Sequence, residues 1–163
     1  MASLSIAAAV ASFLGLVKSA AKLTAEDRQF IGLELSEARL SDEKRALALW
    51  VITWSLRHTS PQSWRNHAEA ISSEVTSRAP ADGEVADDAW IASRFHAYQQ
   101  CHQFTAAEFS LATLSQRLGA AFASLCGADG NRELGAYGAK IYETMLPLMH
   151  DFMASLELQA PSP

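Results

Sequence analysis

The feature that most constrains the fold is the segment ALALWVITWSL (Ala46–Leu56), which is apolar on every face of a helix. A helix that is apolar all round is buried on most of its sides by other elements. Ser41, followed by Asp42 and Glu43, has the pattern of a helix N-terminus. We therefore expect one central buried helix over about residues 42–58, which the rest of the chain has to cover.

Hydrophobic periodicity predicts that further helices supply this cover. Apolar residues recur at helical spacing on both sides of the central segment, over about residues 3–22, 24–40, 60–78, 87–104, 105–127 and 132–158. Apolar and polar residues do not alternate in any window as they do in a half-buried strand, so we expect no sheet. The predicted fold class is all-α, a single compact bundle of six to seven helices.

Local patterns predict where several of these helices begin and end. Thr24 and Asn131 have the character of N-caps, and Thr105–Glu108 matches a capping box. Gly127 is placed to end a helix in the left-handed conformation. Pro147 is predicted to kink or split the last helix, because proline has no amide hydrogen to donate.

The last helical segment carries two further patterns. Gly135 and Gly138 lack side chains and predict the close approach of another helix. Met145, Met149 and Met153 recur at i, i+4 and i+8. Such a stripe is typical of core packing and, less commonly, of copper(I) binding, and we interpret it as core packing.

Chain length predicts one domain. The chain has 163 residues, of which 49% are hydrophobic, so it is long enough to bury one sizeable core. Residues 1–158 are expected to form a single helical domain, with an exposed loop near residues 79–86, where the letters APADGEV interrupt the periodicity. Residues 159–163 are expected to be a disordered tail.

Charge and cysteine content argue against several classes of protein. The 18 acidic and 13 basic residues give a net charge of −5, which argues against nucleic acid as a partner. Cys101 and Cys126 are too few for a disulfide framework. We expect both to be free thiols in a cytoplasmic protein.

The N-terminal segment has three interpretations. Its first charged residue is Lys18, after the apolar run, whereas a secretory signal has its positive charge before that run. A membrane span needs about 20 apolar residues, and this run is shorter. Residues 1–22 could instead contact a membrane surface or dock on a partner, but we favour a bundle helix because the central helix needs cover.

Motifs for catalysis and metal binding are not found in the sequence. It contains no HExxH, CxxC, GxSxG or phosphate-binding glycine pattern. His96, Cys101 and His102 lie close in sequence, but their spacing directs them to different faces of a helix. We therefore predict no catalytic residue, no metal site and no cofactor.

One group of residues is a candidate ligand site. Trp50 and Trp54 in the central segment and Phe95 and Tyr98 in a later one are predicted to line a pocket, with polar anchors supplied by Arg94 and His102. Alternatively, Arg94 is partly buried and needs a carboxylate or carbonyl partner, or it lies at the edge of the core with its charged group in solvent, which is the interpretation we favour.

Two functional hypotheses remain. The first is a non-enzymatic interaction protein, such as a regulator, an adaptor or an immunity-type binder. It would bind a protein partner, or form a homo-oligomer, through an apolar helix face of the first or last segment. The second is a small-ligand-binding helical domain with the aromatic pocket described above.

Overall fold

Helices account for nearly all regular structure in this computed structural model, which describes residues 2–79, 87–104, 107 and 110–159. The α-helices within that part of the chain are α1 (Ile6–Ala21), α2 (Glu37–His58), α3 (Gln62–Arg65), α4 (Ala68–Arg78), α5 (Asp88–Gln100), α6 (Leu111–Leu125) and α7 (Arg132–Ser155). A 3-10 turn, η1 (Asp27–Gln29), and two short strands, β1 (Ala2–Leu4) and β2 (Leu156–Leu158), complete the regular elements. The predicted all-α bundle is confirmed.

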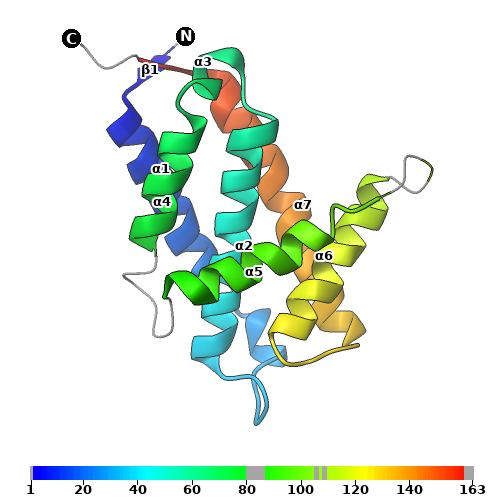
Figure 1. The fold of residues 1–163 in the computed structure, drawn as a ribbon. Coiled ribbons are helices and arrows are strands. Elements are labelled where there is room, and N and C mark those ends of the chain that lie inside the picture. Colours follow the sequence, from blue (N-terminus) through cyan, green and yellow to red (C-terminus); the bar gives the residue numbers. More distant parts are fainter. Residues whose placement is uncertain (1, 80–86, 105–106, 108–109, 160–163) are drawn as a thin grey trace.

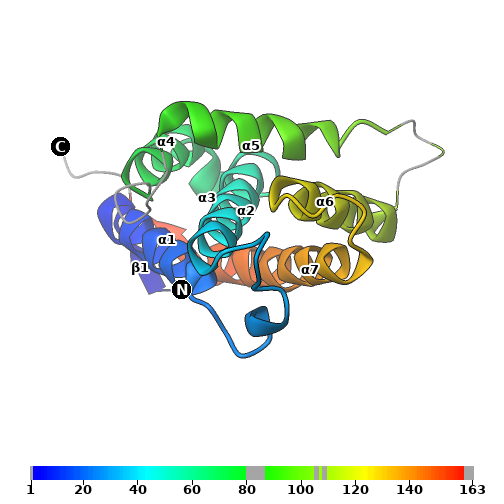
Figure 2. The same ribbon diagram turned by 90° about the horizontal axis from the view of Figure 1, so that it is seen from below.

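Helix α2 lies at the centre of the bundle (Figure 1). Figure 2 shows α1, α4, α5 and α7 arranged around it, with α6 packed beside α7. Every side chain from Asp42 to Thr53 is buried. The central buried helix predicted over about residues 42–58 is therefore confirmed.

The start of α2 differs from the prediction. The helix begins at Glu37 and is capped by Ser36, so Ser41 lies inside it. The helix predicted over residues 24–40 is wrong in its first part, where residues 22–36 form a loop that contains only the turn η1.

Asp27 explains why this loop is not a helix. Its side chain is fully buried and accepts hydrogen bonds from the amide and the hydroxyl of Thr24. Thr24 is thus a donor to the Asp27 carboxylate, whereas the predicted N-cap would have been an acceptor. Because the Asp27 carboxylate binds the buried Lys44 side chain, this part of the chain is held against the bundle and does not form a new helix.

The apolar side of α1 faces the core. The helix begins after Ser5, which caps it, and it buries Ala9, Val10, Phe13, Val17 and Ala21. These contacts confirm that residues 1–22 supply a bundle helix. In the part of the chain that the structure describes, no helix combines the length and the apolarity needed to cross a bilayer.

The two ends of the described chain pair with each other. β1 and β2 form a parallel two-stranded sheet, so the expectation of no sheet is wrong (Figure 1). Strands of three residues are too short to show alternation in the sequence. The Gln159 amide donates to the Leu4 carbonyl at 2.9 Å. The expected disorder of residues 159–163 is therefore wrong at Gln159, and residues 160–163 lie outside the described part.

Two predicted helix ends are confirmed. Asn131 caps α7 by accepting a hydrogen bond from the Leu134 amide. Gly127 follows α6 with a φ of 83°, the left-handed conformation that favours glycine. Ser110 caps α6, while three of the four residues of the predicted capping box, Thr105–Glu108, lie outside the described residues.

The segment after α2 forms two helices where one was expected. α3 and α4 are separated by Asn66 and His67, yet the apolar residues at helical spacing in this segment are all buried, namely Trp64, Ala68, Ile71 and Val75. The loop predicted near residues 79–86 begins with a buried Ala79. Residues 80–86 lie outside the described part of the chain.

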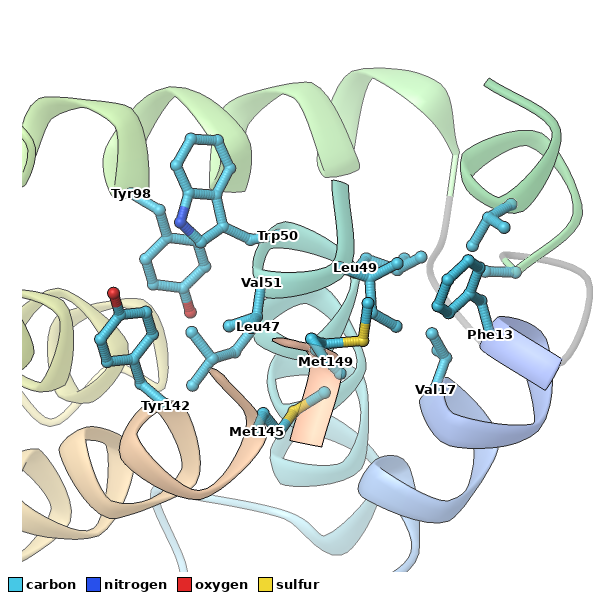
Figure 3. Close-up of a cluster of buried hydrophobic side chains, with 14 of the residues drawn as sticks. Phe13, Val17, Leu47, Leu49, Trp50, Val51, Tyr98, Tyr142, Met145 and Met149 are labelled. Carbon is cyan, nitrogen blue, oxygen red and sulfur yellow. The ribbon is translucent and has the colours of Figure 1, made fainter. Parts of the chain in front are cut away.

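α7 runs through Pro147 without a break, so the predicted split is wrong. Its three methionines, Met145, Met149 and Met153, are buried, which confirms the core-packing interpretation. Figure 3 shows the first two among the buried side chains of the core. The neighbouring Leu148 is 54% exposed, because it lies on a different side of the helix from the buried Met149.

Glycines allow α6 and α7 to pack at very short range. A β-carbon added to Gly119 would overlap the Gly135 carbonyl oxygen. One added to Gly138 would lie 2.7 Å from the Phe122 ring. The close approach predicted at Gly135 and Gly138 is confirmed.

Gly119→Ala should destabilise the protein, because the new methyl group overlaps backbone atoms of α7. Overpacking of this kind costs about 1–3 kcal/mol, measurable as the free energy of unfolding in urea. Gly15→Ala in α1 is the matched control: it has open space around it and should stabilise the protein by about 0.5–1 kcal/mol. Equal stability of the two variants would contradict the close packing.

Candidate functional site

Packing of α5 on α2 brings the predicted site residues together. The ring centroid of Trp50 lies 5.5 Å from that of Phe95, 6.2 Å from that of Tyr98 and 5.7 Å from that of His102. Figure 3 shows the Trp50 and Tyr98 rings side by side in the core. Sequence reasoning therefore identified a genuine cluster from two segments that are about 45 residues apart.

The cluster is filled by its own rings. Trp50 is 5% exposed and Tyr98 is fully buried. Their tilted and edge-on contacts are those of packed aromatic side chains. The aromatic residues that were expected to line a pocket thus contact one another across the α2–α5 interface.

Trp54 and two histidines form the solvent-facing edge of the cluster. The indole of Trp54 stacks on His58 and on His102, with 4.9 Å between ring centroids in both contacts. His58 Nδ1 donates to the Trp54 carbonyl at 2.9 Å. Burial lowers the pKa of His102, and the nearby His58 lowers it further, so the His102 ring is neutral at pH 7.

Arg94 binds a buried carboxylate. Its Nη2 donates to Glu43 Oε1 at 2.6 Å, and its Nε lies 3.2 Å from both carboxylate oxygens. Its guanidinium also lies over the Trp90 ring, 4.4 Å from the centroid. Burial raises the pKa of Glu43, and Arg94 opposes this shift. The alternative in which Arg94 needs a carboxylate partner is therefore the one observed.

Sequence reasoning missed a run of buried charges on α2. Asp42, Glu43, Lys44 and Arg45 are all less than a tenth exposed. Ser41, Asp42 and Glu43 were interpreted as a helix N-terminus, and no ion pair was predicted for any of the four charges. The pairing of opposite charges at Asp42 and Arg45, three residues apart, was the available clue, and these two side chains form an ion pair at 2.7 Å.

Lys44 and Asp27 form the most deeply buried ion pair, with 2.7 Å between Nζ and Oδ2 and side chains 5% and 0% exposed. Lys44 also donates to the Lys22 carbonyl, and the Tyr137 hydroxyl donates to Asp27 Oδ1 at 2.7 Å. Burial alone would raise the pKa of Asp27, but hydrogen bonds from Lys44, Tyr137 and Thr24 outweigh it and lower the pKa. This network holds the loop before α2 against α7.

The aromatic cluster contains polar atoms that lack a partner. Among the described residues, Trp50 Nε1, Tyr98 OH and His102 Nε2 are buried and have no hydrogen-bond partner. Burial and the nearby Glu43 raise the pKa of Tyr98 well above its ordinary value, so the phenol is neutral. A bound water or a small ligand is one way in which such atoms are satisfied.

The two cysteines are free and buried. Burial raises the pKa of both thiols, that of Cys126 to about 12. Thiolate is the reactive form of cysteine, so neither residue is poised as a nucleophile. Within the described residues, no three His, Cys, Asp or Glu side chains come together in a group that could hold a metal ion.

A groove of about 700 Å³ lies between α6 and α7. Its walls carry small residues from both helices, and it extends to the turn between them, where Asp129 and Arg132 line it. The groove exists because the glycine contacts bring the two helices together while alanines occupy their outward faces.

Comparison with protein-family models, with curated proteins and with solved structures yields no match for this chain. Functional inference therefore depends on the site geometry alone.

Asp27 and Glu43 should give the free energy of unfolding opposite dependences on pH. The folded-state pKa of Asp27 is lowered, so its contribution is present at neutral pH and is lost as the pH falls below 3.8. The folded-state pKa of Glu43 is raised, so its contribution is present below pH 4.5 and is lost as the pH rises through the raised pKa. Urea unfolding from about pH 3 to 8 gives the free energy of unfolding as a function of pH. Asp27→Asn should reduce the change of this free energy at acidic pH, and Glu43→Gln should reduce its change above pH 4.5. Identical pH profiles for the two variants would refute these assignments.

Two tyrosine variants test whether the aromatic cluster holds a ligand. Tyr98→Phe removes an unpartnered buried hydroxyl and should leave the free energy of unfolding unchanged or raise it by up to about 1 kcal/mol. Tyr137→Phe removes a hydrogen bond to the Asp27 carboxylate and should lower it by about 1.5–3 kcal/mol. If Tyr98→Phe is as destabilising as Tyr137→Phe, the Tyr98 hydroxyl has a bound partner in solution.

Proposed function

We propose that this protein is a non-enzymatic helical interaction protein of the cytoplasm that binds a partner helix in the groove between α6 and α7. A regulator, an adaptor or an immunity-type binder fits this description. The observation that carries the proposal is the groove itself, an unfilled channel of about 700 Å³ with small residues on both walls. The two free cysteines support a reducing compartment.

The walls of the groove suit a helix. Ala120 and Ala123 on α6 face Gly135, Ala136 and Ala139 on α7. Helix axes pack 8–10 Å apart, depending on the side chains at the contact, and small residues allow the shorter spacing. A partner helix with small residues at its centre would lie along the groove, over both helices, and turn the hairpin into a three- or four-helix unit.

The charges along α7 indicate which helix fits. Arg132, Ala136, Ala139 and Glu143 are spaced by four, three and four residues, so they form one stripe along the helix. A base lies at one end of the stripe and an acid at the other. A second α7 in the antiparallel direction would place its Glu143 opposite Arg132, and the two-fold axis would repeat the pair. A second copy of this chain is therefore the partner whose chemistry we infer.

Small-ligand binding at the aromatic cluster is the second candidate. It is supported by the three unpartnered polar atoms of Trp50, Tyr98 and His102. It is weakened by the close mutual packing of the rings, which occupy the space that a ligand would need.

Charge reversal tests the antiparallel pairing. Arg132→Glu and Glu143→Arg should each weaken self-association by about fivefold, because each places like charges opposite one another. The double variant should restore the dimer, since the acid and the base of each intermolecular pair then exchange places and opposite charges face one another again. The measurement is the dimer dissociation constant from sedimentation equilibrium.

Arg28→Glu supplies the matched control, because Arg28 is an exposed arginine in η1, away from the groove. It should leave the dissociation constant unchanged. Ala136→Trp fills the groove and should abolish the dimer. A protein that stays monomeric at millimolar concentration, or a dimer insensitive to Ala136→Trp, would overturn the proposal.

A further inference from the structure

Two histidines from different parts of the chain meet at one tryptophan, on the edge of the aromatic cluster. His58 is exposed at the end of α2, and His102 follows the last turn of α5. Both imidazoles stack on the indole of Trp54, with interplanar angles of 19° and 27°. Because Trp54 belongs to α2, its contact with His102 fastens the end of α5 to the central helix, which α5 crosses (Figure 1).

The two imidazoles differ in their hydrogen bonds. His58 Nδ1 lies 2.9 Å from the Trp54 carbonyl oxygen, and the rest of this side chain is exposed. His102 Nε2 is buried and has no hydrogen-bond partner. A neutral imidazole carries a hydrogen on one nitrogen, whereas an imidazolium carries one on both. Protonation of His102 therefore places a charged donor at a buried position that offers it no acceptor, which is costly.

The charged groups nearest to His102 are basic. α2 contributes His58, and α6 contributes Arg117, which donates to the backbone carbonyl of the residue after His102 at 2.9 Å. The buried acid of α2, Glu43, lies about three helical turns before Trp54. Its carboxylate is already paired with the Arg94 guanidinium at 2.6 Å. A proton on His102 thus gains no direct partner from Glu43.

The other titratable groups of the neighbouring elements are neutral or bonded elsewhere. Burial raises the pKa of Cys101 and that of Tyr98, so both side chains are neutral at pH 7. Glu143 on α7 accepts a hydrogen bond from Ser115 on α6 at 2.6 Å. In the part of the chain that the structure describes, no carboxylate pairs with His102.

Two effects favour the protonated ring of His102 and two oppose it. The face of an indole attracts a cation, and the C-terminal end of a helix does so too. Burial opposes the charge, and so does the neighbouring His58. The pKa of His102 is lowered, with burial as the larger cause. The opposing effects therefore dominate in the folded chain.

We propose that His58, Trp54 and His102 form an acid-sensitive latch, which holds the end of α5 on α2 while His102 is neutral and releases it when His102 gains a proton. The release follows because an imidazolium has to reach water to be solvated, and His102 reaches water only by leaving the indole of Trp54. Cys101 and Tyr98 lie in the turn before His102 and are buried, so the same movement uncovers one side of the aromatic cluster.

The pH range of the latch follows from linkage between protonation and folding. The folded-state pKa of His102 lies below the ordinary value of 6.5, so the neutral ring stabilises the fold above pH 6.5, and this contribution is lost as the pH falls below 6.5. One proton changes the equilibrium constant of unfolding by at most about tenfold per pH unit. Glu43 acts in the opposite direction because its folded-state pKa is raised, so each variant has to be compared with the wild type at the same pH.

Urea unfolding of the wild type and of His102→Gln, at one protein concentration and from about pH 7.5 to 5, tests the latch. Below pH 6.5 the equilibrium constant of unfolding should rise more steeply in the wild type than in His102→Gln as the pH falls. His96→Gln is the matched control, because His96 is an exposed histidine of the same helix. Its profile should run parallel to that of the wild type.

Nuclear magnetic resonance of the full chain shows whether the effect is local to the end of α5. The His102 ring should titrate with a midpoint below 6.5, and His58→Gln should move this midpoint upward. The amides of Cys101 and His102 donate to the carbonyls of Tyr98 and Gln99. Their protection factors against hydrogen exchange should fall together with the His102 titration, while those of α7 are retained.

Three results would each contradict the latch. They are a His102 midpoint at or above 6.5, parallel unfolding profiles for the wild type and His102→Gln, and protection of the Cys101 and His102 amides that does not change with pH. None of these measurements depends on the groove between α6 and α7, so the latch and the proposed dimer can fail separately.

Discussion

The run of charged residues at the start of the buried part of α2 controls how the other elements surround it. Asp42, Glu43, Lys44 and Arg45 are all buried, and a buried charge is costly unless it is paired. Successive residues on a helix point about 100° apart, so the four side chains leave α2 in different directions. Glu43 requires α5, Lys44 requires the loop at residues 22–36, and Arg45 faces α1 and α4. Helix α5 and the loop are thus placed by the charges that they neutralise, whereas Arg45 is paired with Asp42 of the same helix.

Ion pairs of this kind specify an arrangement more than they stabilise it. The free energy of folding comes chiefly from apolar burial, which has no direction and would tolerate several rotations of α5 on α2. The contact between Arg94 and Glu43 selects one of them. Tyr98 lies one helical turn after Arg94 and is fully buried against Trp50 in that rotation. The aromatic cluster therefore depends on a charge pair for its geometry.

The sequence predicted the helices better than the contacts between them. Periodicity located the buried helix, and the stripes on α2 and α5 were enough to assemble Trp50, Phe95 and Tyr98, because buried faces must meet. The loop at residues 22–36 was not predicted, because Thr24 matches an N-cap in the local sequence. The ion pair that turns Asp27 toward the buried Lys44 is visible only in the structure. That contact spans 17 residues and has no local pattern. Likewise, the strand pairing joins the two ends of the chain and leaves no periodicity to detect.

The position of α2 also makes the two sides of the bundle different in polarity. On the side of α1 and α4, Arg45 lines a cavity together with Lys18 and Arg78. On the side of α7, Lys44 is paired with Asp27, which also accepts a hydrogen bond from Tyr137. The groove between α6 and α7 is lined by alanine and glycine and by the polar residues Gln116, Asp129, Asn131 and Arg132, and among the described residues that line it there is none of α2. The charge of the first surface thus comes partly from the central helix, whereas the charge of the groove comes from α7 and the turn before it.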